Sequence, residues 1–400
     1  MAPLPGLRKP GVFGNGFEPR FLRRTDRRMI KKPRVSVLMA VHNGQSYLGQ
    51  AIESLLSQTL GDFELVVVDD ASTDDTPLLL ESAAHRDCRI VRLRNDKNLG
   101  LAGALNRGLT ICRASLVARA DADDVFMPER LERQARFMEQ NLDVGVLGTA
   151  VEFIDEKGQH REDKLQHFHT QPAHLRFHTH LGCCFWHSTV MFRPELVRSV
   201  GGYDAARFIH GPEDYDLWAK LIEKTAFQNL PEVLVKQRLH GTSVTAKWTV
   251  GFKLYCSVSQ RLLSRYLDRP LNEQDANDVV TLFGWTSPLS RESIFNGVRL
   301  LREIRVCART REDRDTLALF ERQCISSFFT EAAIMVYADP AASRRLMLEA
   351  VCWSPTTLFS FPSLMLGIRL ATPAALREVF KRVKRLFAFQ NCGIFSGKST

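Results

Sequence analysis

The Cys-x-x-Cys motif is absent from this 400-residue sequence, although the sequence contains nine cysteines. An odd number of cysteines, with Cys183 and Cys184 adjacent, argues against a disulfide framework or a zinc knuckle and predicts free thiols in a reducing compartment. No apolar run reaches the roughly 18 residues typical of a membrane-spanning helix. The nearest candidate, residues 358–370, is interrupted by Pro362 and Arg369. The start of the sequence lacks the apolar segment of a secretory signal, so we expect a cytoplasmic protein.

Two glycine-rich nucleotide-binding motifs are also missing. The sequence contains no Gly-x-x-x-x-Gly-Lys-[Ser/Thr] element, and Gly100 and Gly103 do not have the spacing of the dinucleotide fingerprint. These glycines allow a phosphate to approach the backbone in proteins that carry the motifs. The sequence therefore offers no support for a P-loop nucleoside triphosphatase or a Rossmann dehydrogenase.

Positive charge is concentrated at the beginning of the chain. The formal net charge is +9, and residues 1–34 carry ten Lys/Arg against two acidic side chains, which is +8. The remainder is close to neutral, so we expect no nucleic-acid partner. We expect a basic disordered leader at 1–33, an α/β domain at 34–247 and a helical region at 248–400. Met29, just before the first predicted strand, is a hypothetical second translation start.

Apolar strands alternate with amphipathic helices from residue 34 onward. The predicted strands are 35–41, 63–68, 89–93, 115–120 and 189–192, with an extended stretch at 232–238. The predicted helices are 48–56, 78–84, 101–112, one that opens at Pro128, and 213–224. This alternation predicts an α/β fold whose central sheet is mostly parallel and flanked by helices. Ligands of such sheets bind beyond the carboxyl ends of the strands.

Three carboxylates, Asp121, Asp123 and Asp124, follow the predicted strand at 115–120. Unpaired at the end of a buried strand, they would repel one another and resist desolvation. A divalent cation that bridges them to a phosphorylated ligand resolves both problems, and hard oxygen ligands favour Mg²⁺ or Mn²⁺. The alternative is a solvated acidic turn that caps the following helix. Of the three residues, we expect Asp124 to be such a local cap.

Two further acidic groups stand at the ends of predicted elements. Asp69 and Asp70 end the second strand, where a carboxylate can accept hydrogen bonds from a nucleobase or a ribose, or can cap the next turn. Glu213, Asp214 and Asp216 open an amphipathic helix, where they either pair with the helix dipole or supply a general base for an incoming hydroxyl. The dipole argument predicts that Asp214 stays ionised, with lowered basicity.

Histidines are dense between residues 160 and 187. His174 and His178 have the i, i+4 spacing of a metal site on a helix, but no carboxylate or cysteine completes such a site. This pattern favours a polar loop or partly buried histidines. His240 is different, because it ends an extended segment in a loop from which it can reach a phosphate or a metal.

An apolar stripe lies beside Lys and Arg side chains near residues 374–389. This pattern is typical of a basic amphipathic helix, which either packs on its own domain or lies on an anionic membrane surface. The sequence therefore leaves open a peripheral contact with the inner face of the plasma membrane.

These elements, taken in order, resemble the family 2 glycosyltransferases of the GT-A fold over about residues 34–245. The matching segments are Val35 to Gly44, Ile52 to Thr59, Glu64 to Asp74, Asn98-Leu99-Gly100, Asp121-Ala122-Asp123-Asp124, His187 to Arg193, Gly201-Gly202-Tyr203-Asp204 and Glu213 to Trp218. Two positions depart from the family pattern. His42 stands where Tyr is common, and Gln237 stands where Tyr often precedes Arg238.

The resemblance implies inverting transfer of a sugar from a UDP- or GDP-linked donor, with Mg²⁺ or Mn²⁺ as cofactor. The residues it implies are Ala40 and Val41 lining the nucleotide pocket, Asp70 on the base, Asp121 on the ribose or the metal, Asp123 on the metal, Glu213 and His240 near the donor, and Asp214 as general base. It also implies that the GT-A domain is the segment 34–247.

The implied acceptor is a hydroxyl of a glycan or of a lipid-linked molecule, and the implied process is surface polysaccharide biosynthesis. The chain has neither the Gln-x-x-Arg-Trp motif nor the several membrane spans of processive synthases, which indicates non-processive transfer. Two alternatives stay open. One is a sugar nucleotidyltransferase, which would normally carry a Gly- and Arg/Lys-rich loop where this chain has His42 to Ser46. The other is a non-catalytic scaffold that binds nucleotide sugars.

Overall fold

The computed structural model describes residues 32–161, 170–208, 211–241, 248–284, 290–335 and 339–353. The chain divides into two compact units, residues 1–32 and 33–400, and the elements below all belong to the second. The strands are β1 (Val35–Val41), β2 (Phe63–Asp69), β3 (Ile90–Arg94), β4 (Val117–Asp121), β5 (Val125–Phe126), β6 (Val144–Ile154), β7 (Met191–Phe192) and β8 (Ala226–Arg238).

Seven helices accompany the strands and five follow them within the described residues. The first group is α1 (Leu48–Leu56), α2 (Thr76–Arg86), α3 (Gly100–Leu109), α4 (Arg130–Gln140), α5 (Pro172–His178), α6 (Pro194–Ser199) and α7 (Glu213–Leu221). The second group is α8 (Trp248–Tyr266), α9 (Glu273–Gly284), α10 (Arg291–Arg311), α11 (Arg314–Met335) and α12 (Pro340–Trp353). The change from alternating to helical architecture after about residue 245 agrees with the sequence pattern.

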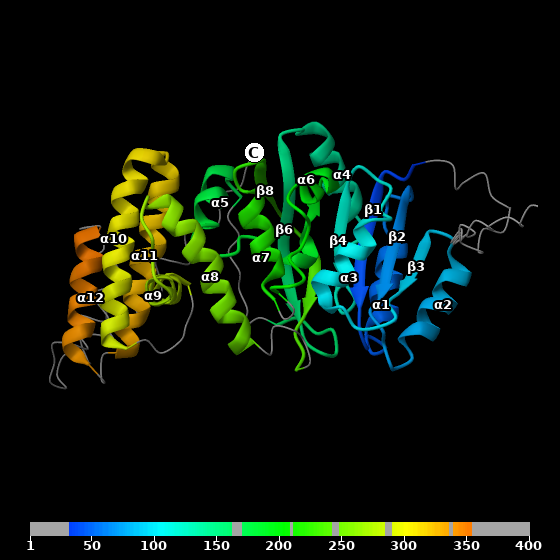
Figure 1. The fold of residues 1–400 in the computed structure, drawn as a ribbon, viewed down its shortest axis with the longest axis horizontal. Helices are drawn as coiled ribbons and strands as arrows, with labels where there is room; N and C mark the ends of the chain where they lie inside the picture. Colours follow the sequence, from blue (N-terminus) through cyan, green and yellow to red (C-terminus); the bar gives the residue numbers. More distant parts are fainter. Residues whose placement is uncertain are drawn as a thin grey trace, which may run out of the picture. The chain divides into compact units, whose positions relative to one another are not determined.

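The eight strands form one sheet in the order β3-β2-β1-β4-β7-β6-β8-β5 (Figure 1). Four of its pairings are parallel, namely β2 with β3, β1 with β2, β1 with β4, and β6 with β8. The pairings that involve β5 and β7 are antiparallel. The predicted α/β class with a helical C-terminal region is confirmed, and the sheet is mixed beyond β4.

The sequence patterns missed most of the second half of the sheet. No strand is predicted at β6, and only the last part of β8 is recognised as extended. The pairing of β6 with β8 contains irregularities near Val144, Thr149 and Ala150, and the burial along both strands does not alternate regularly. Because strand recognition relies on a period of two, an interrupted alternation hides long strands.

Two apolar cores lie on the opposite faces of the sheet, because successive strand side chains point to opposite sides. On β1, Leu38 belongs to the core that includes α3, whereas Val37 and Met39 belong to the core that includes α1 and α4. The first core also contains buried side chains of α8 to α12. The sheet and the helical region therefore share one core, and the boundary expected near residue 247 stays a prediction.

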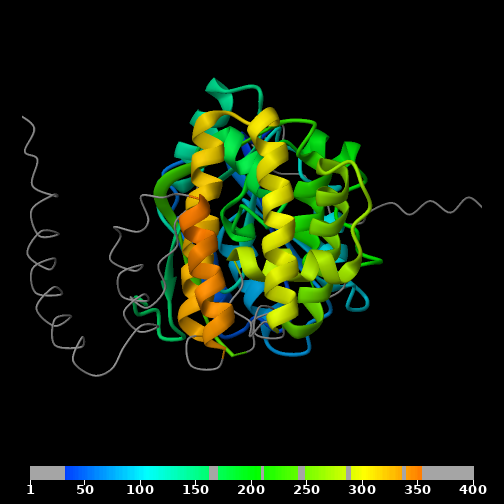
Figure 2. The ribbon, with the colours of Figure 1, turned by 90° about the vertical axis from the view of Figure 1, so that its left-hand side faces the viewer.

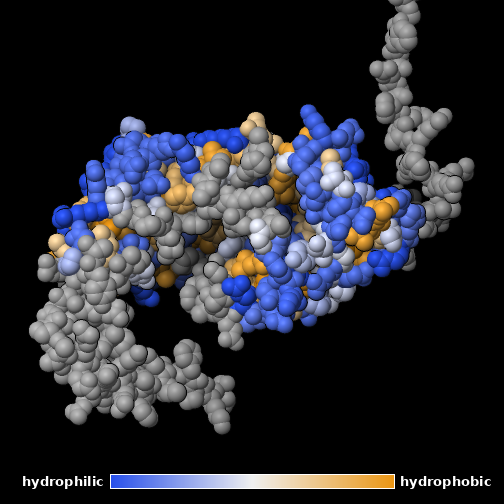
Figure 3. All heavy atoms as spheres, turned by 90° about the horizontal axis from the view of Figure 1, so that it is seen from below, coloured by the Kyte–Doolittle hydropathy of each residue, from blue (hydrophilic) through white to orange (hydrophobic). Residues whose placement is uncertain are grey.

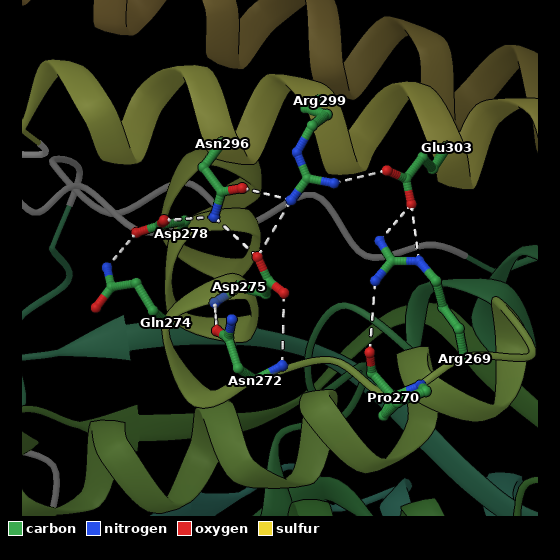
Figure 4. Close-up of polar contacts among 9 residues, drawn as sticks. All are labelled: Arg269, Pro270, Asn272, Gln274, Asp275, Asp278, Asn296, Arg299 and Glu303. Carbon is green, nitrogen blue, oxygen red and sulfur yellow. Dashed lines mark hydrogen bonds and ion pairs between the residues drawn. The ribbon is translucent and has the colours of Figure 1, made fainter.

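The last helices pack against one another as a bundle (Figure 2). A polar network joins α9 to α10 (Figure 4). Asn296 donates to Asp278 Oδ2 at 2.8 Å and to Asp275 Oδ1 at 3.0 Å, and Arg299 pairs with Glu303 at 2.8 Å. Asp275 and Asp278 are buried, so these bonds satisfy carboxylates that would otherwise be costly to bury. The network is thus a polar tie inside the bundle.

The visible surface in Figure 3 is mainly hydrophilic, with smaller hydrophobic patches between charged residues. Exposed large apolar side chains are scattered over several elements, among them Leu78 on α2 and Val306 on α10. Among the residues that the structure describes, no helix combines the length and apolar character that a membrane span needs. The predicted amphipathic helix near 374–389 lies outside the described residues.

Close packing of α3 on the sheet gives a stability prediction. A Cβ at Gly108 would lie 2.4 Å from Leu38 Cδ1 and 2.9 Å from Val68 Cγ2. Both neighbours are fully buried, so neither can move into solvent. We expect Gly108→Ala to lower the free energy of unfolding by about 1–3 kcal/mol in urea titrations.

The matched control is Gly49→Ala on α1, where a Cβ would meet nothing within 4 Å. In that helix the same change should raise the free energy of unfolding by up to about 1 kcal/mol. Equal effects of the two substitutions would contradict the packing argument.

Candidate active site

Three strand ends meet at one edge of the sheet and carry most of the predicted site residues. The parallel register places Ala40 of β1 opposite Asp121 of β4, and Val41 opposite Asp69 of β2. The Asp70 N–H donates to the carbonyl of Val41 at 2.8 Å. Residues that are far apart in sequence are therefore neighbours, as expected for the carboxyl ends of parallel strands.

The two carboxylates at the end of β2 have different partners. Asp69 accepts the N–H of Ser72 at 2.9 Å and pairs with Arg94 at 2.6 Å, so it takes the turn-capping part. Asp70 is buried, and its Oδ1 accepts hydrogen bonds from Asn95 Nδ2 at 2.5 Å and Leu99 N–H at 2.9 Å. Those bonds tie Asp70 to the segment that leads into α3.

Left-handed backbone marks the loops after β1 and β2. Asn43 has φ 54° and Ala71 has φ 58°. Such conformations cost non-glycine residues roughly 1–2 kcal/mol and collect at functional sites. Asn43 offsets part of this cost, because its Oδ1 accepts the Thr73 N–H at 2.8 Å and its own N–H donates to Ser72 Oγ at 2.9 Å. The two loops thus hold each other beside Ala40 and Asp70.

Carboxylate oxygens of Asp121, Asp123 and Asp124 lie within 4.8 Å of one another. Asp121 pairs with the buried Arg119, and Asp123 Oδ2 lies 2.8 Å from His240 Nε2. Asp124 is buried, and its Oδ2 has no hydrogen-bond partner among the described residues. Burial and the two neighbouring carboxylates raise the pKa of Asp124 well above its usual range. This oxygen-rich cluster with an unsatisfied carboxylate oxygen suits a hard divalent cation.

The expectation that Asp124 caps a helix is wrong. Its Oδ1 instead accepts the backbone N–H of Arg238 at 2.9 Å, and α4 begins at Arg130 without a side-chain cap. The Arg238 guanidinium donates to the Asp123 carbonyl at 2.9 Å and lies over the Tyr47 ring. The physical reason is tertiary, because the end of β8 folds over the acidic turn and buries Asp124.

His240 lies beside the cluster of Asp121, Asp123 and Asp124, as its position in the loop after β8 led us to expect. Its bond to Asp123 raises the pKa of the imidazole, which is partly opposed by burial. Its ring also contacts that of Tyr47, with centroids 5.1 Å apart. The sequence placed His240 near a phosphate or a metal, and the structure brings it to Asp123.

Glu213 and Asp214, at the start of α7, belong to a second and largely buried group. Its other members are His187 and Tyr203, whose Nε2 and hydroxyl oxygen are 2.9 Å apart. His187 Nδ1 lies 3.6 Å from Glu213 Oε1. Burial raises the pKa of Glu213 and lowers that of His187 to about 3. The histidine is therefore neutral near pH 7.

Arg119 is a buried cation that interacts with both groups, and no sequence pattern pointed to it as a site residue. Burial lowers its pKa, but Asp121 outweighs that effect, and Glu213 also raises it. Its positive charge in turn lowers the pKa of Asp214. The available signal was an arginine inside the apolar run Ser115 to Ala120, which is unusual unless the charge is paired.

Asp214 combines burial with neighbouring charges. Its pKa is raised, mainly by burial and further by Glu213, while the Arg119 cation lowers it. The dipole argument from sequence predicted lowered basicity, and that prediction is wrong. A helix dipole contributes about 0.3–1 kcal/mol, and desolvation of a carboxylate is the larger effect here. A raised pKa suits a group that must accept a proton near neutral pH.

The helical region supports the Asp214 side of the site. The Cys183 N–H donates to the Tyr255 hydroxyl of α8 at 2.6 Å, and the Cys183 thiol lies 4.0 Å from Asp214 Oδ2. Tyr215, next to Asp214, contacts Ser259 of α8 through their hydroxyls at 2.9 Å. The helix that carries Asp214 is therefore packed against residues beyond the predicted boundary.

The histidine-dense segment forms no metal site among the described residues. His174 is fully buried in α5, with its ring centroid 6.0 Å from that of His178, and the His180 ring contacts that of Tyr266 in a tilted arrangement. This agrees with partly buried histidines. His167 and His169 lie outside the described residues. The eight cysteines in the described part of the chain are free, as expected.

Alignments with two curated relatives each cover more than half of this chain. The Bacillus subtilis (strain 168) protein "Putative glycosyltransferase EpsE" is 37% identical over 213 residues, which are 52% of this chain and 74% of the relative. The Escherichia coli "O-antigen biosynthesis glycosyltransferase WbnJ" is 34% identical over 234 residues, 57% of this chain and 87% of the relative. The family model "Glycosyl transferase family 2" matches residues 36–201. This chain belongs to glycosyltransferase family 2.

Family 2 membership confirms the resemblance seen in the sequence, and the chain is a glycosyltransferase. A solved structure of S. aureus TarS residues 1–349 in complex with UDP-GlcNAc aligns with a TM-score of 0.51. Sequence identity in that alignment is 16%, and it covers 80% of this chain and 91% of TarS 1–349. This likeness shows the GT-A fold of the glycosyltransferase.

Buried His187 gives a prediction about acid stability. Its pKa is about 3 in the folded enzyme, whereas an unfolded histidine titrates near about 6.5. Its contribution to stability is therefore complete above that value and is lost as the pH falls, by at most about 1.4 kcal/mol per pH unit. We expect the wild type to lose stability relative to His187→Gln as the pH falls from about 7 to 4 in urea titrations.

The control for this prediction is His85→Gln, at an exposed position on α2. Its free energy of unfolding should follow that of the wild type across the same pH range. A constant difference between the wild type and His187→Gln would show that the buried imidazole does not titrate as described.

Proposed function

We propose that this glycosyltransferase moves a sugar, with inversion, from a UDP- or GDP-sugar to a hydroxyl of a glycan or lipid-linked acceptor. One observation carries the proposal. A cluster of carboxylates suited to a cation lies at the strand ends, and the half-buried Asp214, with its raised pKa, is linked to that cluster through Arg119. This division separates the group that would hold a diphosphate from the group that would accept a proton.

The donor would lie along the ends of β1, β2 and β4. Ala40 and Val41 would line the nucleotide pocket through their backbone, and Asp70 would face the base. Asp121 and Asp123 would hold Mg²⁺ or Mn²⁺, with Asp121 also within reach of the ribose. When bound, the metal would offset the negative charge that develops on the departing diphosphate. Glu213 would border the donor on the side of Asp214, and His240 would border it on the side of Asp123.

Asp214 would act on the acceptor. The hydroxyl donates its proton to Asp214 as its oxygen bonds to the anomeric carbon of the donor sugar. The bond from that carbon to the diphosphate oxygen breaks, and a nucleoside diphosphate leaves. Because a sugar hydroxyl is a weak acid, its proton leaves late, as the new bond forms. A base with a raised pKa is better matched to that step than a fully solvated aspartate.

The biological setting is proposed from the relatives. WbnJ, 34% identical over 234 residues, is described as an O-antigen biosynthesis glycosyltransferase. We propose that this enzyme likewise acts in surface polysaccharide biosynthesis and releases its product after adding one or a few sugars. Hydrolysis of a panel of UDP- and GDP-sugars with Mn²⁺ would identify the donor. Formation of a nucleotide sugar from a sugar phosphate would indicate a nucleotidyltransferase, and no turnover would favour a scaffold.

Loss of the base should abolish transfer without abolishing donor binding. We expect Asp214→Asn to lower kcat by at least about 100-fold, because proton removal by a positioned base contributes about that much. Binding of UDP or GDP, followed by calorimetry, should be unchanged. The matched control is Asp75→Asn, the same substitution at an exposed position. Normal turnover of Asp214→Asn would remove Asp214 from this function.

Loss of a metal ligand should have the opposite signature. We expect Asp123→Asn to weaken Mn²⁺-dependent binding of the nucleoside diphosphate by at least about tenfold, while binding without metal changes little. Calorimetric titrations with and without Mn²⁺ measure both quantities. Asp143→Asn, at an exposed position before β6, is the matched control. Equal metal dependence in the two variants would mean that Asp123 is not a ligand.

A further inference from the structure

A groove rich in arginine lies between α10 and α12, in the helical region. It consists of two adjoining cavities of about 240 and 360 Å³, which share Arg302 and Glu349. Figure 2 looks onto this group of helices. We call this feature the arginine groove, and its charged lining residues are Arg299, Arg302, Arg305, Arg309, Arg345 and Glu349. It belongs to neither half of the candidate active site.

The arginine groove carries an excess of positive charge. Five arginines and one glutamate line it. Arg299 pairs with Asp275 and Glu303, and Arg305 pairs with Glu321, so the excess rests on the other arginines. The Glu349 carboxylate already has two partners, because it pairs with Arg302 and accepts the Trp353 indole N–H at 2.8 Å. Arg309 and Arg345 are exposed, and neither has a carboxylate partner among the described residues. The groove therefore presents guanidinium groups whose charge no described residue balances.

Apolar surface accompanies this charge. Phe295 and Trp353 line the cavities, and the Arg345 guanidinium lies over the Phe295 ring at 4.2 Å. Val306 lines the second cavity and is 64% exposed. Leu348 on α12 is not part of the lining but is also 64% exposed. A binding partner that offers anionic groups beside apolar ones would match both properties.

The segment that follows the groove is an unsuitable occupant for it. Residues 354–400 continue directly from α12 and carry seven Lys/Arg against one Glu, a formal charge of +6. Like charges would repel one another in the groove. The same charge would instead be attracted to any anionic surface that the groove contacts.

We propose that the arginine groove docks the enzyme on an anionic lipid surface, with guanidinium groups binding lipid phosphates and with Val306 and Leu348 contacting the acyl boundary. One planar guanidinium group can donate to two phosphate oxygens at once, which the compact ammonium group of lysine does less well. Polar binding next to apolar contact is the combination that holds proteins at membrane interfaces. This site is independent of the proposed donor and acceptor chemistry.

The test is co-sedimentation of the full chain with vesicles of phosphatidylglycerol and phosphatidylcholine, compared with vesicles of phosphatidylcholine alone. We expect Arg309→Gln/Arg345→Gln to lower the partition coefficient on the anionic vesicles by about 30-fold, from the typical contribution of a basic residue at such a surface. Because neither arginine pairs with a carboxylate in the part of the chain that the structure describes, the fold should be retained, which thermal melting checks. If the double variant is unstable, Val306→Ser, at an exposed position, should also lower the partition coefficient.

The matched control is Arg265→Gln/Arg322→Gln, two exposed arginines of α8 and α11 that do not line the groove. Retained binding in the control, together with loss in the groove variant, supports the proposal. Equal loss in both would reflect net charge alone and overturn it, as would unchanged binding of the groove variant or no binding by the wild type. Inorganic pyrophosphate is the last arm. Complete release by pyrophosphate, but not by sulfate of equal ionic strength, would assign the groove to a soluble phosphate instead.

Discussion

Parallel pairing of β1 with β2 and β4 is the constraint on which the site depends. It brings Ala40 beside Asp121 and Val41 beside Asp69, so that residues about thirty to eighty positions apart share one edge of the sheet. A register shift of one residue would move each of these side chains to the opposite face and separate the carboxylates. The two apolar cores oppose such a shift, because alternate residues of β1 are committed to different faces.

Arg119 makes the convergence of so many acids possible. The buried guanidinium pairs with Asp121 and also interacts electrostatically with Glu213 and Asp214. Without it, carboxylates at partly desolvated positions would repel one another and take up protons. The same environment keeps His187 neutral and Asp214 more basic than a solvated aspartate. Charge balance in this site therefore depends on β4 and α7 together.

Local patterns predicted the parts of the chain whose burial is regular. The strands β1, β2 and β4 are short and almost entirely buried, and the acids at the ends of β2 and β4 can be read directly from the sequence. The same patterns missed β6, misjudged Asp124 as a cap, and expected the helix dipole to control Asp214. In each case a distant segment decided the outcome: β8 paired irregularly with β6, the end of β8 covered Asp124, and surrounding residues desolvated Asp214.

The sequence by itself determined the family, the α/β class and the identity of the acids at the strand ends, because these follow from short apolar runs and the residues that punctuate them. The tertiary structure alone decided which acids meet, which are buried and how their charges are balanced. Burial and Coulomb interactions depend on distances through space, which spacing along the chain does not reveal. The arginine groove illustrates the same division, since four of its arginines share α10 but Arg345 and Glu349 join them only when α12 lies beside α10.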